Sequence, residues 1–310
     1  MTLPFPAYLE LYETGELHRR VDRAISLLGK CVICPRACQA NRLADERGEC
    51  RVGRRAMVAS YGPHFGEERP LVGQYGSGTI FFSYCSLRCL FCQNYTISQM
   101  GEGEEVSPAQ LASMMLHLQR QGCHNINFVT PTHVVPQILE ALEIAVPQGL
   151  HLPLVYNTGG YDSLATLRLL DGIIDIYMPD MKYSDAKIAE ELSGIKDYPK
   201  VNRAAVKAMQ AQVGDLVMDE AGIARRGLII RHLVLPHGLA GTEDILHFIA
   251  EEISRDAYVN IMDQYWPCYR AHGYPLLNRP VAREEFLEAL RLAESVGLTR
   301  LDEHSSRSPF

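Results

Sequence analysis

Short apolar runs alternate with amphipathic stretches along most of the chain after residue 79. The runs are rich in β-branched and aromatic residues, and turn-forming residues follow them. Strands that are buried on both faces of a parallel sheet have this pattern. We therefore predict six strands, over Thr79–Phe82, Asn125–Val129, Leu154–Tyr156, Ile173–Met178, Leu228–Leu235 and Tyr258–Met262.

The amphipathic stretches between these runs predict helices. The clearest one follows the N-cap residue Ser107, begins at Pro108 and stops at Gly122. The others cover Val134–Ala145, Ser163–Leu170, Lys200–Ala211 and Thr242–Ile253. Six strand–helix units predict an α/β fold, namely a partial (β/α)6 TIM-like barrel rather than the full eight-stranded form. A doubly wound sheet stays open as an alternative, because periodicity alone does not separate the two.

The first 70 residues have a different character. An amphipathic helix is expected over Tyr8–Leu28, and a Cys- and Arg-rich stretch without a clean period follows it, punctuated by Gly and Pro. We therefore divide the chain into a small Cys-rich N-terminal module, residues 1–70, and a barrel with a C-terminal helical extension, residues 71–310.

Composition excludes several classes of protein. With 47% hydrophobic residues, the 310-residue chain is neither disordered nor a small disulfide scaffold. The formal charge of −7 argues against a dedicated nucleic-acid binder. No apolar run reaches the roughly 18 residues of a membrane span, and the N-terminal residues lack the pattern of a secretory signal. We expect a cytoplasmic protein with neither nucleic acid nor membrane as a partner.

The nine cysteines are the strongest indication of function in the composition, because seven of them are clustered. Three of these seven, Cys85, Cys89 and Cys92, lie on one short loop after the first predicted strand. Thiolates at this spacing can hold the irons of an iron–sulfur cluster. Three protein ligands leave one iron of a 4Fe–4S cluster open to an external ligand, whereas a structural zinc site takes four. The loop therefore favours a catalytic 4Fe–4S cluster over zinc.

The CxxxCxxC pattern, with Phe91 before its last cysteine, resembles the signature of radical S-adenosylmethionine enzymes. The surrounding YCSLRCLFCQNYTIS is similar, more narrowly, to the branch of the pyruvate formate-lyase activating enzymes. The resemblance covers about residues 76–262. It implies that S-adenosylmethionine chelates the open iron and is cleaved reductively to a 5′-deoxyadenosyl radical, which abstracts hydrogen.

Further positions are assigned by this resemblance. After the second strand, Thr130-Pro131-Thr132-His133 stands where family members carry a Gly-Gly-Glu-like stretch that binds the amino group of S-adenosylmethionine, so Thr130 is a candidate contact. Asn157, Thr158 and Asp180, at the ends of the next two strands, would bind a monovalent cation. Lys182 would bind the S-adenosylmethionine carboxylate.

Two later strands supply the remaining candidates. Arg231 lies inside an apolar strand, where a charge is costly unless it is paired, so we expect it at the site near S-adenosylmethionine. By position in the resemblance, Met262 and Gln264 form the wall that holds the adenine. Phe91 completes the predicted cofactor-binding set.

The second cysteine group is Cys31, Cys34, Cys38 and Cys50. Four thiolates around a turn-rich stretch can close a tetrahedral site, so zinc or a second iron–sulfur cluster is chemically reasonable. The spacing of these cysteines does not distinguish zinc from an iron–sulfur cluster, and it does not exclude four ordinary buried thiols.

The leading functional hypothesis is a radical S-adenosylmethionine oxidoreductase that abstracts hydrogen from a protein or peptide, as in glycyl-radical activation. The resemblance also implies a reductant such as flavodoxin or ferredoxin. Two alternatives stay open, namely action on a small molecule and a non-catalytic iron–sulfur protein for electron transfer or sensing.

Overall fold

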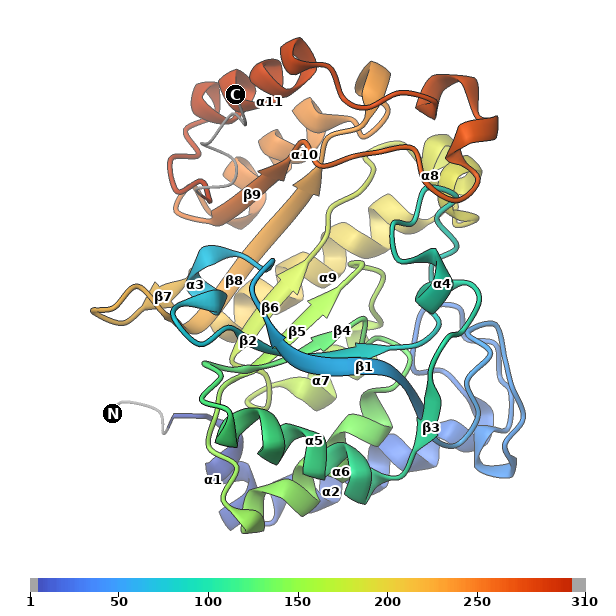
Figure 1. Cartoon of the computed structure of the whole chain (residues 1–310), viewed down its shortest axis with the longest axis vertical. Coiled ribbons are helices and arrows are strands. Elements are labelled where there is room, and N and C mark those ends of the chain that lie inside the picture. Colours follow the sequence, from blue (N-terminus) through green and yellow to red (C-terminus); the bar gives the residue numbers. More distant parts are fainter. Residues whose placement is uncertain (1–4, 303–310) are drawn as a thin grey trace.

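The computed structural model describes residues 5–302, which form an open nine-stranded sheet (Figure 1). Six of its strands are parallel and lie side by side in chain order. They are β2 (Ser77–Phe82), β4 (Ile126–Val129), β5 (Leu154–Thr158), β6 (Ile176–Pro179), β8 (Ala224–Leu233) and β9 (Tyr258–Met262). A doubly wound sheet would reverse its strand order at a switch point, so the predicted partial (β/α)6 TIM-like barrel is confirmed.

The strand positions agree with the sequence prediction, but some ends differ. β5 continues two residues further, through Asn157 and Thr158, and both side chains are buried. β6 begins at Ile176 rather than Ile173, because the chain turns at residues 171–173. β8 begins at Ala224, where it pairs with the short antiparallel β7 (Val217–Met218).

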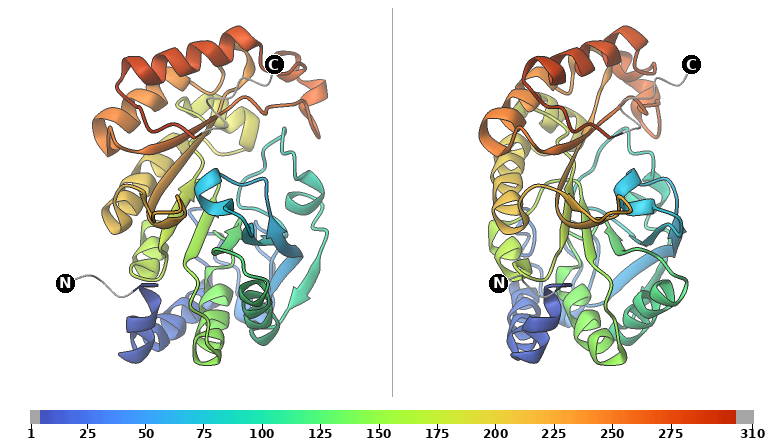
Figure 2. Two further views of the ribbon diagram at one scale, coloured as in Figure 1. Left: turned by 60° about the vertical axis from the view of Figure 1, so that its left-hand side comes forward. Right: turned by 90° about the vertical axis from the view of Figure 1, so that its left-hand side faces the viewer.

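Helices connect successive parallel strands. They are α5 (Pro108–Arg120), α6 (Val135–Ala145), α7 (Leu164–Leu170), α8 (Ala186–Ser193), α9 (Tyr198–Val213) and α10 (Thr242–Phe248), which continues as one π-helical segment, Ile249–Ile253. Ser107 caps α5 in a capping box with Gln110, as its sequence indicated. The prediction missed α8. Figure 2 shows α11 (Arg283–Ser295) at one end of the molecule and the N-terminal helices at the other.

The predicted N-terminal helix is two helices, α1 (Tyr8–Glu13) and α2 (Glu16–Ser26). The break falls at Gly15, whose φ of +72° is left-handed and cannot continue a helix. α2 packs against α6. Residues 27–55 are irregular except for the single turns Leu27–Lys30 and Arg42–Ala44.

Two antiparallel strands precede the parallel ones in the sheet. β1 (Ala56–His64) pairs with β2, and β3 (Glu104–Val106) pairs with the start of β1. Sequence reasoning did not predict β1, because Gly62 and Pro63 interrupt its apolar pattern. β1 joins residues before position 70 to the barrel sheet; the proposed domain boundary itself stays a prediction.

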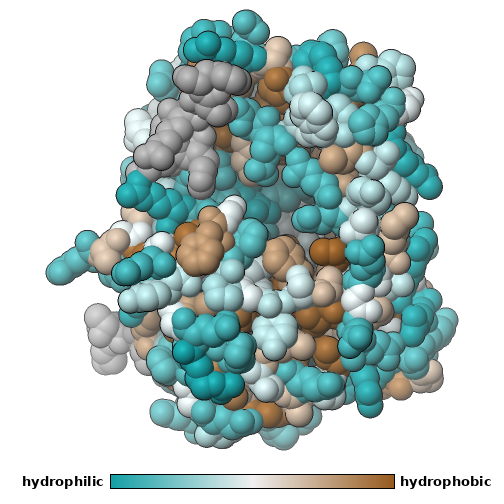
Figure 3. Space-filling model, in the orientation of Figure 1, coloured by the Kyte–Doolittle hydropathy of each residue, from teal (hydrophilic) through white to brown (hydrophobic). Residues whose placement is uncertain are grey.

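The face shown in Figure 3 is largely hydrophilic, and its hydrophobic side chains gather around a hollow central part. Within residues 5–302, no helix is both long enough and apolar enough to cross a bilayer.

Candidate active site

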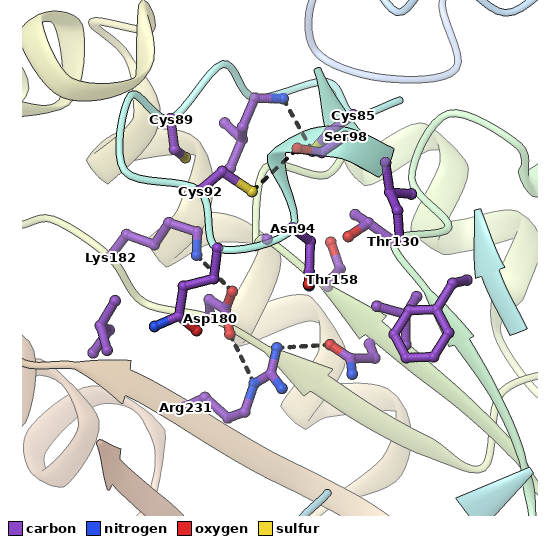
Figure 4. Close-up of a pocket in the computed structure, with 18 of the residues that line it drawn as sticks. Cys85, Cys89, Cys92, Asn94, Ser98, Thr130, Thr158, Asp180, Lys182 and Arg231 are labelled. Carbon is purple, nitrogen blue, oxygen red and sulfur yellow. Dashed lines mark hydrogen bonds and ion pairs between the residues drawn. The ribbon is translucent and has the colours of Figure 1, made fainter. Parts of the chain in front are cut away.

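The loop after β2 places three cysteines around one cavity. β2 ends at Phe82, and Cys85, Cys89 and Cys92 then border a cavity of about 370 Å³ at the carboxyl ends of the parallel strands (Figure 4). Barrel folds bind their ligands at this end of the sheet. The three sequence-predicted cluster ligands therefore share one solvent-accessible space.

Hydrogen bonds hold the three sulfurs in place. The Cys85 Sγ accepts the backbone N–H of Leu87 at 3.4 Å, and the Cys89 Sγ accepts the Ser193 hydroxyl at 2.9 Å. The Cys92 Sγ lies 3.1 Å from the Ser98 hydroxyl. Burial raises the pKa of the Cys85 thiol to about 12.

The loop backbone is docked on the end of α8. The N–H groups of Arg88 and Leu90 donate to the carbonyls of Ser193 and Leu192, at 3.3 and 2.9 Å. These carbonyls lie in the last turn of α8, where they have no partner within the helix. The helix that the sequence prediction missed is therefore the support of the cysteine loop.

A partly buried charge network forms the opposite wall of the cavity. Asp180, one residue after β6, accepts from Lys182 Nζ at 2.7 Å and from Arg231 Nε at 2.8 Å (Figure 4). Burial opposes ionisation of Asp180, but the positive charges of Arg231 and Lys182 outweigh it and hold its pKa below the ordinary value. Burial likewise disfavours the Lys182 cation, yet Asp180 and Cys89 raise the pKa of Lys182 above its usual value. The network stays charged at neutral pH.

Two acidic residues that sequence reasoning missed complete the surroundings of Arg231. Glu67 and Glu68 follow β1, are buried, and approach the Arg231 guanidinium to 3.9 Å. Burial raises the pKa of Glu68, although Arg231 opposes the shift. Glu67 lines the cavity, because the pairing of β1 with β2 places the segment after β1 beside it. No local motif marks this pair, so only the long-range pairing could have revealed it.

The oxygens predicted to bind a monovalent cation already have protein donors. The Asn157 Oδ1 accepts from Arg231 Nη2 at 2.7 Å, and both Asp180 oxygens are bonded as described above. The Thr158 hydroxyl donates to Asp162 Oδ2 at 2.7 Å and lies 2.9 Å from the Thr132 hydroxyl. The Arg231 guanidinium lies between Asp180 and Asn157, so it already partners two of the predicted cation ligands, and the cation itself stays a prediction.

The other predicted cofactor-binding residues also border the cavity, namely Phe91, Thr130, Met262 and Gln264. The buried Phe91 ring packs edge-on against Tyr183 and Tyr265. The Gln264 backbone carbonyl accepts from the Gln93 side chain at 2.8 Å, which links the cysteine loop to the end of β9. The cavity thus collects candidates from every parallel strand, while their individual roles remain predictions.

Cys31, Cys34, Cys38 and Cys50 do not border this cavity. His133 does not border it either, because its buried ring points to the carbonyl of Ser83, 3.0 Å from Nε2. The N-terminal cysteines form a separate feature of the molecule.

Comparison with known families decides the interpretation of the cysteine loop. The sequence model of the radical SAM superfamily matches residues 79–223, which span β2, the cysteine loop and the Asp180–Lys182 segment. The chain belongs to the radical SAM superfamily. An uncharacterized protein of Methanocaldococcus jannaschii is 34% identical over 300 residues, which cover 94% of this chain and 82% of that protein. A second one is 25% identical and covers 87% and 79%, respectively.

A solved structure supports the fold of this radical SAM protein. A radical SAM methyltransferase from Sphaerobacter thermophilus superposes with a TM-score of 0.51, covering 74% of this chain and 68% of that one at 14% sequence identity. Such low identity shows a shared fold and nothing more specific about the reaction.

The superfamily implies a 4Fe–4S cluster and S-adenosylmethionine, and the residues present fit both. Three thiols with hydrogen-bond donors on their sulfurs face the cavity, which matches a cluster with one open iron. The partly buried Lys182 ammonium borders the same cavity and offers a partner for a carboxylate. The protein is a radical SAM enzyme.

Proposed function

We propose that this enzyme cleaves S-adenosylmethionine reductively and directs the resulting hydrogen abstraction at a protein or peptide, as glycyl-radical activating enzymes do. One observation carries the proposal: the three cysteine thiols and the partly buried Lys182–Asp180–Arg231 network border the same cavity. When bound, the cluster and S-adenosylmethionine supply a 5′-deoxyadenosyl radical as the hydrogen-abstracting group.

The protein's own residues would bind and orient the cofactor. Lys182 would donate to the S-adenosylmethionine carboxylate, while Asp180 holds that ammonium in position from 2.7 Å. Met262 and Gln264, at the end of β9, would contact the adenine, and Thr130 would face the amino group. Arg231 would take the place that the family resemblance gives to a monovalent cation, since it already bridges Asp180 and Asn157. Cleavage should then be independent of potassium and sodium.

Two exposed side chains that lie close in the chain to residues lining the cavity favour a large substrate over a small one. Trp266 lies two residues beyond Gln264 and is 59% exposed, and Met100, beyond the cysteine loop, is 63% exposed. Exposed Trp and Met side chains are typical contacts of protein and peptide partners. A reductant such as flavodoxin or ferredoxin would deliver the electron to the cluster.

The test is anaerobic reconstitution of the cluster, reduction, and measurement of 5′-deoxyadenosine from S-adenosylmethionine. Candidate peptides deuterated at their glycine α-carbons are then added, and deuterium in the 5′-deoxyadenosine is measured. Transfer from a peptide supports the full proposal, and transfer only from small molecules contradicts the peptide assignment. Absence of cleavage in a protein with four irons would instead favour the non-catalytic iron–sulfur alternative.

A variant of the rim separates substrate docking from cofactor chemistry. Trp266→Ala should raise the KM for a peptide substrate, while cleavage of S-adenosylmethionine without substrate continues at the parent rate. An unchanged KM would remove Trp266 from the docking surface.

A further inference from the structure

Four cysteines that the proposed function does not use come together in the N-terminal loop. Cys31, Cys34 and Cys50 are buried, and Cys38 packs against the same core. Backbone hydrogen bonds of 3.0 Å fold the loop on itself, from Cys31 to Ala40 and from Gln39 back to Cys31. The Ala37 N–H donates to the Cys34 carbonyl at 3.0 Å, and Gly48, two residues before Cys50, packs against Cys38, so the turns of the loop bring the four cysteines together.

The loop passes tightly around one of these sulfurs. A Cβ atom placed on Gly48 would lie 2.3 Å from the Cys38 Sγ, which no real contact allows. Gly48 is therefore required for the chain segment before Cys50 to close against Cys38. Four cysteines on one closed loop match the ligand number of a tetrahedral zinc site.

Two of the four thiols lie near a backbone N–H group two residues further along the chain, as Cys85 does in the catalytic loop. The backbone N–H groups of Arg36 and Val52 lie close enough to Cys34 and Cys50 to favour the thiolates of these two cysteines. The Cys85 sulfur accepts the N–H of Leu87, also two residues further along the chain. A neutral thiol is a weak acceptor, whereas hydrogen bonds to an ionised acceptor are much stronger, so this turn suits a thiolate.

A buried cation beside the four thiols lacks a counter-ion. Arg42 is fully buried; its Nε donates to the Gly53 carbonyl at 3.0 Å and its Nη1 to the His133 carbonyl at 2.8 Å. Nη1 also lies 3.7 Å from the Cys31 sulfur, and Nη2 has no partner. Among residues 5–302, no carboxylate lies within ion-pair distance of this guanidinium. A buried charge is costly unless it is paired, and neutral thiols do not pair it.

We propose that Cys31, Cys34, Cys38 and Cys50 bind one zinc ion as four thiolates, and that Arg42 offsets part of the resulting negative charge. Each thiol releases its proton to solvent on binding, so Zn²⁺ with four thiolates carries a net charge of −2, and no electron is transferred. The four side chains do not yet surround a single point, so they must rotate onto the ion. Four protein ligands leave no open position, which makes the site structural.

The proposed site would brace the catalytic loop. Arg36, between Cys34 and Cys38, donates from Nε to the Ser86 carbonyl at 3.0 Å. Arg88 of the catalytic loop donates to the Glu49 carbonyl at 3.2 Å, beside Cys50. Arg51, on the other side of Cys50, donates to the Gln99 carbonyl at 3.2 Å. Each contact starts or ends within two residues of an N-terminal cysteine, so an ion that fixes these cysteines also fixes the loop that holds Cys85, Cys89 and Cys92.

The test measures zinc and iron per chain in the full-length protein by mass spectrometry, after expression with zinc and anaerobic cluster reconstitution. We expect one zinc per chain in the parent. Cys34→Ser and Cys50→Ser should each lose it, whereas Cys89→Ala and the buried lone-cysteine control Cys123→Ala should keep it. A zinc content that these N-terminal variants do not change would overturn the proposal, as would four extra irons in place of zinc.

Cobalt gives a readout that does not depend on whether a variant folds. Co²⁺ added to the zinc-depleted parent should produce the intense thiolate-to-cobalt absorption and the visible bands of a tetrahedral four-sulfur site, and stoichiometric zinc should abolish them. Absence of these bands would overturn the site. Arg42→Met should weaken zinc binding by about 10- to 100-fold, because it removes the charge that offsets the thiolates. Arg47→Met, which removes an exposed arginine paired with Glu105 in the same region, is the control and should leave zinc affinity unchanged.

Discussion

The two cysteine loops use the same residue in opposite surroundings. The catalytic loop follows β2, its three thiols border a cavity, and it faces the partly buried charges of Lys182 and Arg231 across that cavity. The N-terminal loop has no regular strand or helix beyond single turns, its four cysteines lie away from the cavity, and a buried Arg42 stands beside them. The two loops differ in the number of thiols and in their access to the cavity. Three thiols that border a cavity leave one iron open to a substrate, whereas four packed thiols fit a closed structural site.

The largest expected difference between variants of the two cysteine loops is in catalytic activity. Cys89→Ala should abolish both the core cluster and S-adenosylmethionine cleavage, because two remaining thiolates leave two irons without protein ligands. Cys34→Ser should keep measurable cleavage in freshly reconstituted protein, since Cys34 does not border the cavity. Iron content and 5′-deoxyadenosine yield check both variants. Cleavage by Cys89→Ala at the parent rate would refute the assignment of the catalytic loop.

The next effect is on cofactor affinity. Lys182→Ala and Asp180→Ala should each weaken S-adenosylmethionine binding by roughly ten- to a hundred-fold, because a charge-assisted hydrogen bond contributes about 1.5 to 3 kcal/mol. Titration with S-adenosylmethionine, followed by cluster spectroscopy, gives the affinity. Lys207→Ala is the matched control, because Lys207 is exposed and pairs with Glu252 away from the cavity. Parent affinity in both site variants would assign the network a purely structural role.

Removal of metal from the N-terminal loop should have a smaller, local effect. Stripping zinc with a chelator should make residues 31–55 about tenfold more sensitive to protease, because metal binding would supply much of the free energy that orders this irregular segment. Mass spectrometry of the early fragments locates the cuts. Equal cleavage rates with and without zinc would show that ordinary packing holds the loop.

The smallest expected effect is a pH dependence that involves the histidine between the two loops. Burial lowers the pKa of His133 to about 4 from an ordinary value near 6.5. The unfolded chain therefore binds a proton that the folded chain does not, so His133 makes the free energy of unfolding fall as the pH drops from 6.5 toward 4. The loss should be about 1–3 kcal/mol.

Denaturant unfolding of the parent and of His133→Gln at several pH values measures this contribution. The substitution keeps a donor for the Ser83 carbonyl and should flatten the profile, whereas His151→Gln, at an exposed position, should not. Parallel profiles for the parent and His133→Gln would contradict the assignment. Burial raises the pKa of Asp175 to about 6, so protonation of Asp175 makes the free energy of unfolding rise as the pH drops. Because Asp175 is present in both proteins, the difference between the parent and the variant at each pH gives the contribution of His133 alone.

The parts of the site that sequence reasoning found depend on local signals. The spacing of Cys85, Cys89 and Cys92 is short, and Asn157, Asp180 and Lys182 directly follow or end parallel strands, where a barrel places its ligands. Arg231 stood out because a charge inside an apolar strand requires a partner. These signals depend on a few neighbouring residues, which is why they could be recognised without the fold.

The missed features depend on contacts between distant segments. Glu67 and Glu68 reach Arg231 only because β1 pairs with β2, and an interrupted apolar pattern hides β1. Likewise, only the folded chain brings Arg231 between Asp180 and Asn157, two residues that were predicted to bind a cation. The break of the first helix at Gly15 was visible as a glycine, but a single glycine within a helical pattern does not by itself end a helix.

The pairing of β1 with β2 also bears on how this enzyme can be shortened. The superfamily match begins at residue 79, within β2, so a fragment cut to the matched segment would lose β1. The remaining part of β2 would then become an edge strand, and its main-chain N–H and C=O groups would be open to another molecule along residues 79–82. Such a fragment should aggregate through this edge. A soluble minimal version of the enzyme therefore has to begin before Ala56, upstream of everything that identifies the superfamily.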